Sequence, residues 1–169
     1  MKYANIKYND VSNGPGVRVC LFVSGCSHKC KGCFNEIAWN YNYGSTFDSE
    51  VEDHLIESIN KSYINGITFL GGEPLDPKNR EQVLNIINRM QIDLPSKSIW
   101  CYTGYTYEDI KDLDIIKDIF QKIDVLVDGK FDIDLFEYGL KFRGSTNQRI
   151  IDIKETNKQN KVILWQDSL

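Results

Sequence analysis

The stretch Val17–Asn35 reads VRVCLFVSGCSHKCKGCFN, and it decides the architecture that we predict for the chain. Its first seven residues, 17–23, form an apolar run, which predicts a strand buried on both faces. A Ser-Gly pair interrupts the run, and Cys26, Cys30 and Cys33 then follow with C-x3-C-x2-C spacing. The pattern therefore predicts a buried strand that delivers three thiols into one short loop.

Three thiols in one loop can converge on a single inorganic centre. A [4Fe-4S] cluster normally takes four thiolates, one per iron, so three cysteines would leave one iron open to a substrate or cofactor. A structural zinc site could use the same cysteines with His28, Cys20 or Cys101 as a further ligand. Zinc sites more often use two separated C-x2-C pairs, so the spacing favours the cluster. A zinc-stabilised binding module without catalysis is the alternative.

The remaining cysteines and the loop histidine have simpler interpretations. Cys20 and Cys101 lie within apolar runs, where a free thiol behaves as a small buried hydrophobe. His28 is expected to be an exposed loop residue and not a ligand. A disulfide framework is disfavoured, because the five cysteines are an odd number and no signal peptide precedes them.

Length and composition exclude several classes of protein. A chain of 169 residues suggests one domain with a sizeable core. The net charge of -4 disfavours a nucleic-acid partner. No apolar run approaches the length needed to cross a bilayer, so we expect no membrane partner. The chain is expected in the cytoplasm, a reducing compartment in which thiolates and an open cluster survive.

Strand and helix patterns alternate along the chain. Predicted strands lie at 3–8, 17–23, 67–70, 98–102 and 125–127, and predicted helices at 48–63, from Asp76-Pro77 to about 90, and at 106–122. This alternation predicts the α/β class, with parallel βαβ units and right-handed crossovers. A complete eightfold barrel needs about 250 residues, so this chain could form only part of one.

We assign residues 1–154 to one domain, which ends in a short strand at 150–153. The segment 155–169 is expected to begin with a mobile, charged linker at 155–161. Residues 162–165 could add an edge strand.

Each candidate motif directly follows a predicted strand. The cysteines follow 17–23, G-G-E-P follows 67–70, and T-G and D-G follow the next two strands. Ligands of parallel α/β folds bind at the carboxyl ends of the strands, so these motifs are expected at one site. Gly71 and Gly72 would let the backbone approach a ligand, while Glu73 would accept a hydrogen bond from an ammonium group or shape the loop. A turn before the next helix is the alternative.

These motifs resemble those of the radical S-adenosylmethionine (SAM) superfamily. The aromatic residue follows the last cysteine, in C-x-G-C-F-N, which is similar to the activating proteins of anaerobic (class III) ribonucleotide reductase. The resemblance covers most of the chain, about 13–151. It also rests on N-G-P-G-x-R at 13–18, W-x-Y-T-G-Y at 100–105, V-L-V-D-G-K-F at 125–131 and R-G-S-x-N-Q at 143–148.

The resemblance implies a partial parallel (β/α) barrel of radical SAM type. It implies one [4Fe-4S] cluster on Cys26, Cys30 and Cys33, with SAM chelating the open iron through its amino and carboxylate groups. The stretch Tyr102-Thr103-Gly104 would bound the SAM carboxylate or ribose, and Asp128 would accept a ribose hydroxyl or place a loop; strand-end turns are the alternative. The positions expected around SAM are Gly32, Cys33, Phe34, Gly71, Gly72, Glu73, Thr103 and Asp128.

The activity that the resemblance implies is the generation of a glycyl radical on another protein. The partner would be the large subunit of anaerobic ribonucleoside-triphosphate reductase, in its glycine-bearing C-terminal region, with a one-electron donor such as flavodoxin. A radical SAM enzyme acting on a small molecule, such as a deazaguanine synthase, is the alternative. No catalytic side chain is assigned beyond the cluster and SAM. The segment 143–149 is expected to face the partner, and Arg18 either matches the family motif or carries a surface charge.

Overall fold

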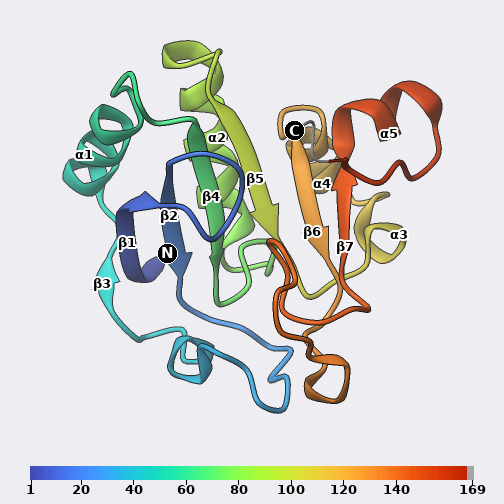
Figure 1. Ribbon diagram of the computed structural model, residues 1–169. Coiled ribbons are helices and arrows are strands. Elements are labelled where there is room, and N and C mark those ends of the chain that lie inside the picture. The colour runs from blue at the N-terminus through green and yellow to red at the C-terminus, as the bar shows by residue number, and fades with distance from the viewer. Residues whose placement is uncertain (167–169) are drawn as a thin grey trace.

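A mixed sheet forms the centre of the computed structural model, which describes residues 1–166 (Figure 1). The strand order is β3-β1-β2-β4-β5-β6-β7, and β2, β4, β5 and β6 are parallel neighbours. The edge pairings β1–β2, β1–β3 and β6–β7 are antiparallel, and the sheet does not close into a barrel. The strands are β1 (Lys2–Asp10), β2 (Arg18–Val23), β3 (Ser45–Thr46), β4 (Gly66–Gly71), β5 (Ser98–Tyr102), β6 (Val125–Asp128) and β7 (Arg149–Asp152).

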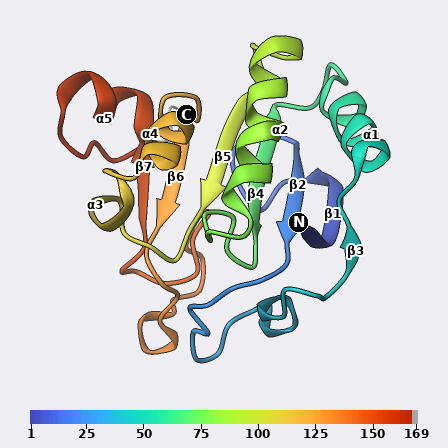
Figure 2. The same cartoon turned by 180° about the vertical axis from the view of Figure 1, so that it is seen from behind.

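Helices cover one face of this sheet. Figure 2, seen from behind, shows α2 in front of β4 and β5, with α1 and α4 to either side. None of the described helices is long and apolar enough to cross a membrane. The α-helices are α1 (Ser49–Ile59), α2 (Arg80–Asp93), α3 (Tyr107–Ile110), α4 (Asp114–Phe120) and α5 (Ile153–Gln159), and the 3-10 helices are η1 (Glu36–Trp39) and η2 (Ile133–Leu135).

The predicted α/β class and the central strands are confirmed. The residues of β2 are buried apart from the half-buried Phe22, as expected for a strand inside a parallel sheet. The apolar face predicted for α2 is also buried against the sheet, and it consists of Val83, Ile86, Ile87 and Met90.

Arg18 is the first residue of β2, and its side chain is fully buried. Its guanidinium donates to Thr68 Oγ1 at 2.8 Å, to Ser98 Oγ at 2.8 Å and to the carbonyl of Ile67 at 2.7 Å, and it lies over the Trp100 ring. Burial lowers the pKa of Arg18 to about 10. The surface charge considered from the sequence is therefore wrong, because this side chain joins β2, β4 and β5.

The first predicted helix begins where expected but ends early. Asp48 caps α1 by accepting from the backbone N–H of Val51 at 3.0 Å. The helix ends at Ile59, not near 63, and Gly66 does not cap it. Gly66 instead starts β4, where a Cβ would lie 1.9 Å from the Ser98 carbonyl oxygen, so glycine is needed for strand packing.

The second predicted helix begins later than expected. Asp76 and Pro77 lie in a turn in which the Asp76 carboxylate accepts from the Lys78 N–H at 3.0 Å. The helix α2 starts at Arg80. The Asp76 carboxylate is also held by the Tyr41 hydroxyl at 2.6 Å, so it ties this turn to the segment after the cysteines.

The helix predicted at 106–122 is two helices, α3 and α4. Leu113 is 44% exposed because it precedes α4 at the break between them. Apolar residues on either side of it are buried, among them Ile110, Ile116 and Phe120.

The expected linker at 155–161 falls largely within α5. Asp152 caps this helix by accepting from the Glu155 N–H at 2.9 Å, and Ile153 and Thr156 are buried. The strand predicted at 150–153 is confirmed as β7, whereas 162–165 contributes one antiparallel bridge between Ile151 and Leu164 in place of an edge strand. The rest of the predicted C-terminal segment, 167–169, lies outside the described residues.

Candidate cofactor site

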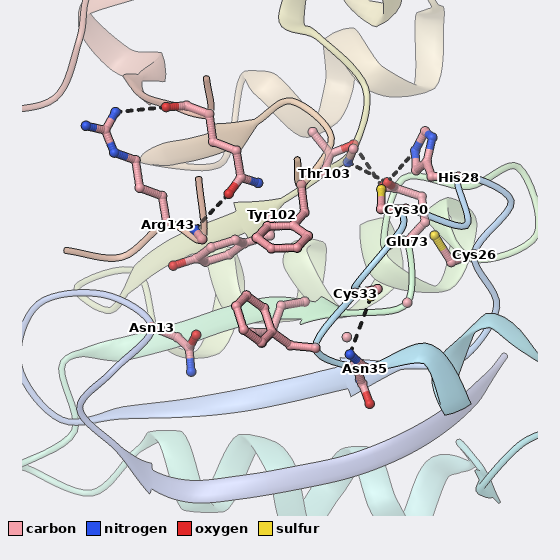
Figure 3. Close-up of a pocket in the computed structure, with 18 of the residues that line it drawn as sticks. Asn13, Cys26, His28, Cys30, Cys33, Asn35, Glu73, Tyr102, Thr103 and Arg143 are labelled. Atoms are coloured by element: carbon pink, nitrogen blue, oxygen red, sulfur yellow. Dashed lines mark hydrogen bonds and ion pairs between the residues drawn. The ribbon is translucent and has the colours of Figure 1, made fainter. Parts of the chain in front are cut away.

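A cavity of about 450 Å³ lies at the carboxyl ends of the parallel strands. In Figure 1 the arrows of β2, β4, β5 and β6 point toward this end of the sheet, from which the cysteine loop emerges. Figure 3 shows Cys26, Cys30 and Cys33 at one side of the cavity, with Asn13 and Arg143 at the other. Of the positions predicted from the sequence, those that line it are Cys26, Cys30, Cys33, Phe34, Gly71, Gly72, Glu73 and Thr103.

Two predicted positions, Gly32 and Asp128, are not among the residues that line the cavity. A Cβ on Gly32 would meet the side chain of Ile133, so this glycine faces the loop after β6. The buried carboxylate of Asp128 accepts from Arg149 Nε at 3.0 Å and from the Tyr107 N–H at 2.8 Å. These contacts are of the kind expected for placing a loop, which is one of the two roles considered for Asp128.

Hydrogen bonds between its backbone and residues that follow it in the sequence hold the cysteine loop in place. The N–H of Gly25 donates to the Ala38 carbonyl at 2.7 Å, and that of Cys26 donates to the Trp39 carbonyl at 3.2 Å. The side-chain amide of Asn79 donates to the Ser24 carbonyl at 3.0 Å. The segment after the cysteines that contains Ala38 and Trp39 thus packs against their loop.

Backbone donors face the three loop thiols. Burial raises the pKa of Cys26 to about 11, while the backbone N–H groups of His28 and Lys29 act to lower it. Burial also raises the pKa of Cys30, and the backbone N–H of Phe131 opposes this shift. The third thiol, Cys33 Sγ, accepts from the Asn35 N–H at 3.4 Å. Hydrogen bonds of this kind stabilise thiolates and tune iron–sulfur clusters, so the donor set suits a cluster.

The three thiols border the cavity without converging on one point. Within residues 1–166, no group of three His, Cys, Asp or Glu side chains is arranged to hold a metal ion. A cubane cluster differs from a single ion in this respect, because each thiolate binds a different iron.

The other two cysteines are buried, as predicted. Cys20 and Cys101 are both 0% exposed. Burial raises the pKa of the Cys20 thiol to about 12 and raises that of Cys101 well above its usual value. Buried, protonated thiols are poor metal ligands, so neither is a candidate fourth ligand.

The buried carboxylate of Glu73 is shared between neighbouring loops. Its Oε1 accepts from the Leu75 N–H and the Thr103 hydroxyl, each at 2.9 Å, and its Oε2 accepts from the Gly104 N–H at 2.7 Å. His28 Nε2 lies 2.9 Å from the same Oε2 (Figure 3). These contacts bear out the loop-shaping role considered for Glu73.

The prediction that His28 is exposed is wrong. Its side chain is 6% exposed, and its ring packs edge-on against Tyr105 with centroids 4.4 Å apart. The loop turns inward, with Lys29 at a φ of +49°, and this turn places the ring between two strand-end loops. The position of a histidine midway between two cysteines was the available sequence signal, but its partner is 45 residues away.

The G-G pair is required by packing as well as by the cavity. A Cβ on Gly72 would lie 2.5 Å from the Gly25 carbonyl oxygen and 3.0 Å from that of Ala38. The Gly72 N–H donates to the Val23 carbonyl at 2.7 Å, and the next N–H, of Glu73, donates to that of Gly25 at 2.8 Å. The strand end of β4 and the cysteine loop therefore lie in direct backbone contact.

Exposed and half-buried aromatic side chains form a cluster that begins at the cavity, which Phe34 and Phe131 line. We call Phe34, Phe131, Phe136 and Tyr138 the aromatic rim. Phe34 is 73% exposed and Tyr138 89%, and the ring centroids of Phe34 and Phe131 are 4.8 Å apart. Phe136 lies 6.0 Å from Phe34 and 4.9 Å from Tyr138 by the same measure.

The R-G-S-x-N-Q motif fixes the loop that carries most of the rim. Gln148 Oε1 accepts from the Gly144 N–H at 2.8 Å, and its Nε2 donates to the Gly129 carbonyl at 2.9 Å. Arg143 donates to the Gln148 carbonyl at 2.8 Å and lines the cavity. Sequence reasoning assigned Asn13 and Arg143 to motifs but did not place them in the cavity, which both line together with Tyr102 and Gly104.

Comparison with known proteins agrees with this arrangement. The family model described as "4Fe-4S single cluster domain" matches residues 12–151. The anaerobic ribonucleoside-triphosphate reductase-activating protein of Enterobacteria phage T4 is 45% identical over 150 residues, covering 89% of this chain and 93% of that protein. The proteins of the same name from Vibrio cholerae and Escherichia coli K12 are each 41% identical, covering 89% and 88% of this chain and 97% and 96% of their own lengths.

Fold, site and comparisons together define an α/β protein with a single-cluster 4Fe-4S domain. More narrowly, the chain belongs to the family of anaerobic ribonucleoside-triphosphate reductase-activating proteins.

Proposed function

We propose that this protein is a radical SAM activating enzyme that generates a glycyl radical on anaerobic ribonucleoside-triphosphate reductase. The observation that carries the proposal is the meeting of the cysteine loop and the G-G-E-P strand end at one cavity, in a chain of this family. The four parallel strands, in a sheet that does not close, are consistent with a partial barrel of radical SAM type.

Cys26, Cys30 and Cys33 would hold one [4Fe-4S] cluster at three of its irons. Bound together, the cluster and SAM supply a one-electron cleavage of the sulfonium, which yields methionine and a 5′-deoxyadenosyl radical. The electron would come from a one-electron donor such as flavodoxin. Burial raises the pKa of Cys26 and Cys30, and the backbone N–H groups that face these two sulfurs act to lower it.

The cavity supplies the surfaces that SAM requires. Gly71 and Gly72 present backbone and no side chain, so the methionine amino group could reach their carbonyl groups. Thr103 borders the same space, although its hydroxyl is held by Glu73. Glu73 would act by fixing the loops around SAM, because its carboxylate already accepts four hydrogen bonds.

The partner would be the glycine-bearing C-terminal region of the reductase large subunit. A glycine has no side chain over its Cα, so a hydrogen atom there is accessible to a radical. The aromatic rim beside the cavity is an exposed apolar surface of the kind that marks protein–protein contact sites. Abstraction of the Cα hydrogen would give 5′-deoxyadenosine and the protein radical. We place this reaction in the cytoplasm.

The test is anaerobic incubation of the reconstituted protein with SAM, reduced flavodoxin and the reductase. We expect a doublet signal of a glycyl radical by electron paramagnetic resonance, together with 5′-deoxyadenosine. The matched variants are Cys26→Ser, which should abolish both products, and Cys20→Ser, which should keep them because Cys20 is buried away from the cavity. SAM cleavage with no protein radical would rule out this substrate.

A further inference from the structure

Three loops that follow different strands meet at one buried carboxylate. Glu73 Oε2 contacts His28 of the loop after β2 and the Gly104 N–H of the loop after β5, while Oε1 contacts Leu75 in its own loop. The exposed fraction of the Glu73 side chain is 1%. A buried carboxylate needs such donors, so the positions of these loops are interdependent.

His28 has a second link that the other donors to Glu73 lack. It lies between Cys26 and Cys30 in the sequence, two residues from each, while its ring reaches Glu73. One residue therefore connects the segment between two predicted cluster ligands to the buried carboxylate. If the ring were released, this segment would be free to move relative to the strand ends.

We propose that His28 is a positioning residue for the cluster, and that it acts through its hydrogen bond to Glu73. The inference rests on the proposed function, because it presumes that Cys26, Cys30 and Cys33 bind the cluster. The imidazole holds the loop segment between the first two cysteines against the strand ends. That contact fixes the segment that joins Cys26 to Cys30, and interactions around the ligands set the reduction potential and the stability of iron–sulfur clusters.

The ring of His28 also packs, and this gives a competing explanation. It lies edge-on to Tyr105, and a Cβ on Gly104 would come within 2.4 Å of it. A packing role needs the shape of the ring, whereas the proposed role needs a donor that reaches Glu73. Substitutions that separate shape from donor therefore decide between the two explanations.

The experiment compares His28→Gln with His28→Met in reconstituted protein. Gln and Met are unbranched and of similar length, but only Gln can donate to Glu73. His28→Phe, which keeps a ring without a donor, is the second variant. His54→Gln is the control, because the His54 side chain is 61% exposed on α1. The readouts are the rate of iron loss to a chelator and the midpoint potential of the cluster, with circular dichroism to confirm folding.

We expect His28→Met and His28→Phe to lose iron about 10–100-fold faster than the unsubstituted protein, with a shifted midpoint potential. His28→Gln should stay close to the unsubstituted protein, and His54→Gln should match it. The proposal is overturned if His28→Met behaves like His28→Gln, or if His28→Phe alone preserves the cluster. If His28→Phe does not fold, the Gln and Met pair still decides. Failure of the unsubstituted protein to bind iron would instead overturn the proposed function.

Discussion

The guanidinium of Arg149 donates from Nε to Asp128 Oδ1 at 3.0 Å, and this contact joins the start of β7 to the end of β6. Arg149 also forms an ion pair with Glu108 of α3 at 2.6 Å. The Asp128 carboxylate contacts the same helix, because it accepts a hydrogen bond from the Tyr107 N–H. Both carboxylates raise the pKa of Arg149, Asp128 more strongly, and Arg149 lowers the pKa of Glu108. The strand-end aspartate thus joins β6, β7 and α3.

Substitution of Arg149 by Gln should destabilise the cluster-free protein. The Asp128 carboxylate is 1% exposed and would lose its charged partner, whereas the Arg149 side chain is 34% exposed, so solvent screens part of the interaction. We therefore expect the unfolding free energy to fall by about 2–3 kcal/mol. Urea unfolding followed by circular dichroism measures it. Lys154→Gln is the control, because Lys154 pairs with Asp124 at the surface and should cost less than about 1 kcal/mol. Equal stabilities of the two variants would contradict this account.

Arg18→Met should lower the unfolding free energy more than the substitution of a surface arginine does. The variant keeps much of the side-chain volume but leaves Thr68, Ser98 and the Ile67 carbonyl without their donor. We expect a loss of about 3–5 kcal/mol in the unfolding free energy of the cluster-free protein. The control is Arg89→Met, which removes partly exposed ion pairs worth about 1 kcal/mol or less. A loss below that of Arg89→Met would show that the buried guanidinium is not structural.

Gly72→Ala should damage both folding and iron binding. Its Cβ would press on the backbone oxygen of Gly25, which cannot move without shifting the cysteine loop. We expect a loss of more than about 2 kcal/mol in the unfolding free energy and lower iron content after reconstitution. Gly139→Ala is the control, since that glycine has a φ of +84° but nothing within 4 Å, so about 1 kcal/mol is expected. Full iron content in Gly72→Ala would contradict the close contact.

The aromatic rim should matter for the partner and not for SAM. The double variant Phe136→Ser/Tyr138→Ser removes two rim residues that do not line the cavity. We expect its affinity for the reductase to fall about tenfold or more, as for aromatic contact residues, while reductant-driven SAM cleavage without the reductase is unchanged. Binding is measured by calorimetry under anaerobic conditions.

The matched control for the rim is Ile92→Ser, because Ile92 is 81% exposed on α2, on the helix-covered side of the sheet. It should leave the affinity for the reductase unchanged. If the rim variant binds the reductase with unaltered affinity, the rim is not the surface that contacts the reductase.

The alternation of apolar runs with helical patterns was enough to predict the four parallel strands and the gathering of motifs at their ends. It could not predict the direction of β1 and β7, because alternation does not distinguish an antiparallel edge strand from a parallel one. A capping signal before α5, Asp152 three residues ahead of Glu155, was present but was outweighed by the polar composition of the segment.

Side-chain roles that depend on distant partners were the hardest to predict. Asp128 was expected either to accept a ribose hydroxyl or to place a loop, and its carboxylate contacts Arg149, 21 residues later. His28 was expected to be an exposed loop residue, yet it contacts Glu73, 45 residues later. In both cases the sheet brings the partner near, and the residues adjacent in sequence do not indicate which partner it is.

The most direct measurement of the central claim uses the reduced protein with SAM carrying ¹⁵N in its methionine amino group. If three cysteines hold a [4Fe-4S] cluster with one iron open to SAM, electron–nuclear double resonance should show a ¹⁵N coupling to the cluster. Cys26→Ser, Cys30→Ser and Cys33→Ser should each lose the cluster signal, while Cys101→Ser keeps it. A reduced cluster with no ¹⁵N coupling at saturating SAM would contradict the account.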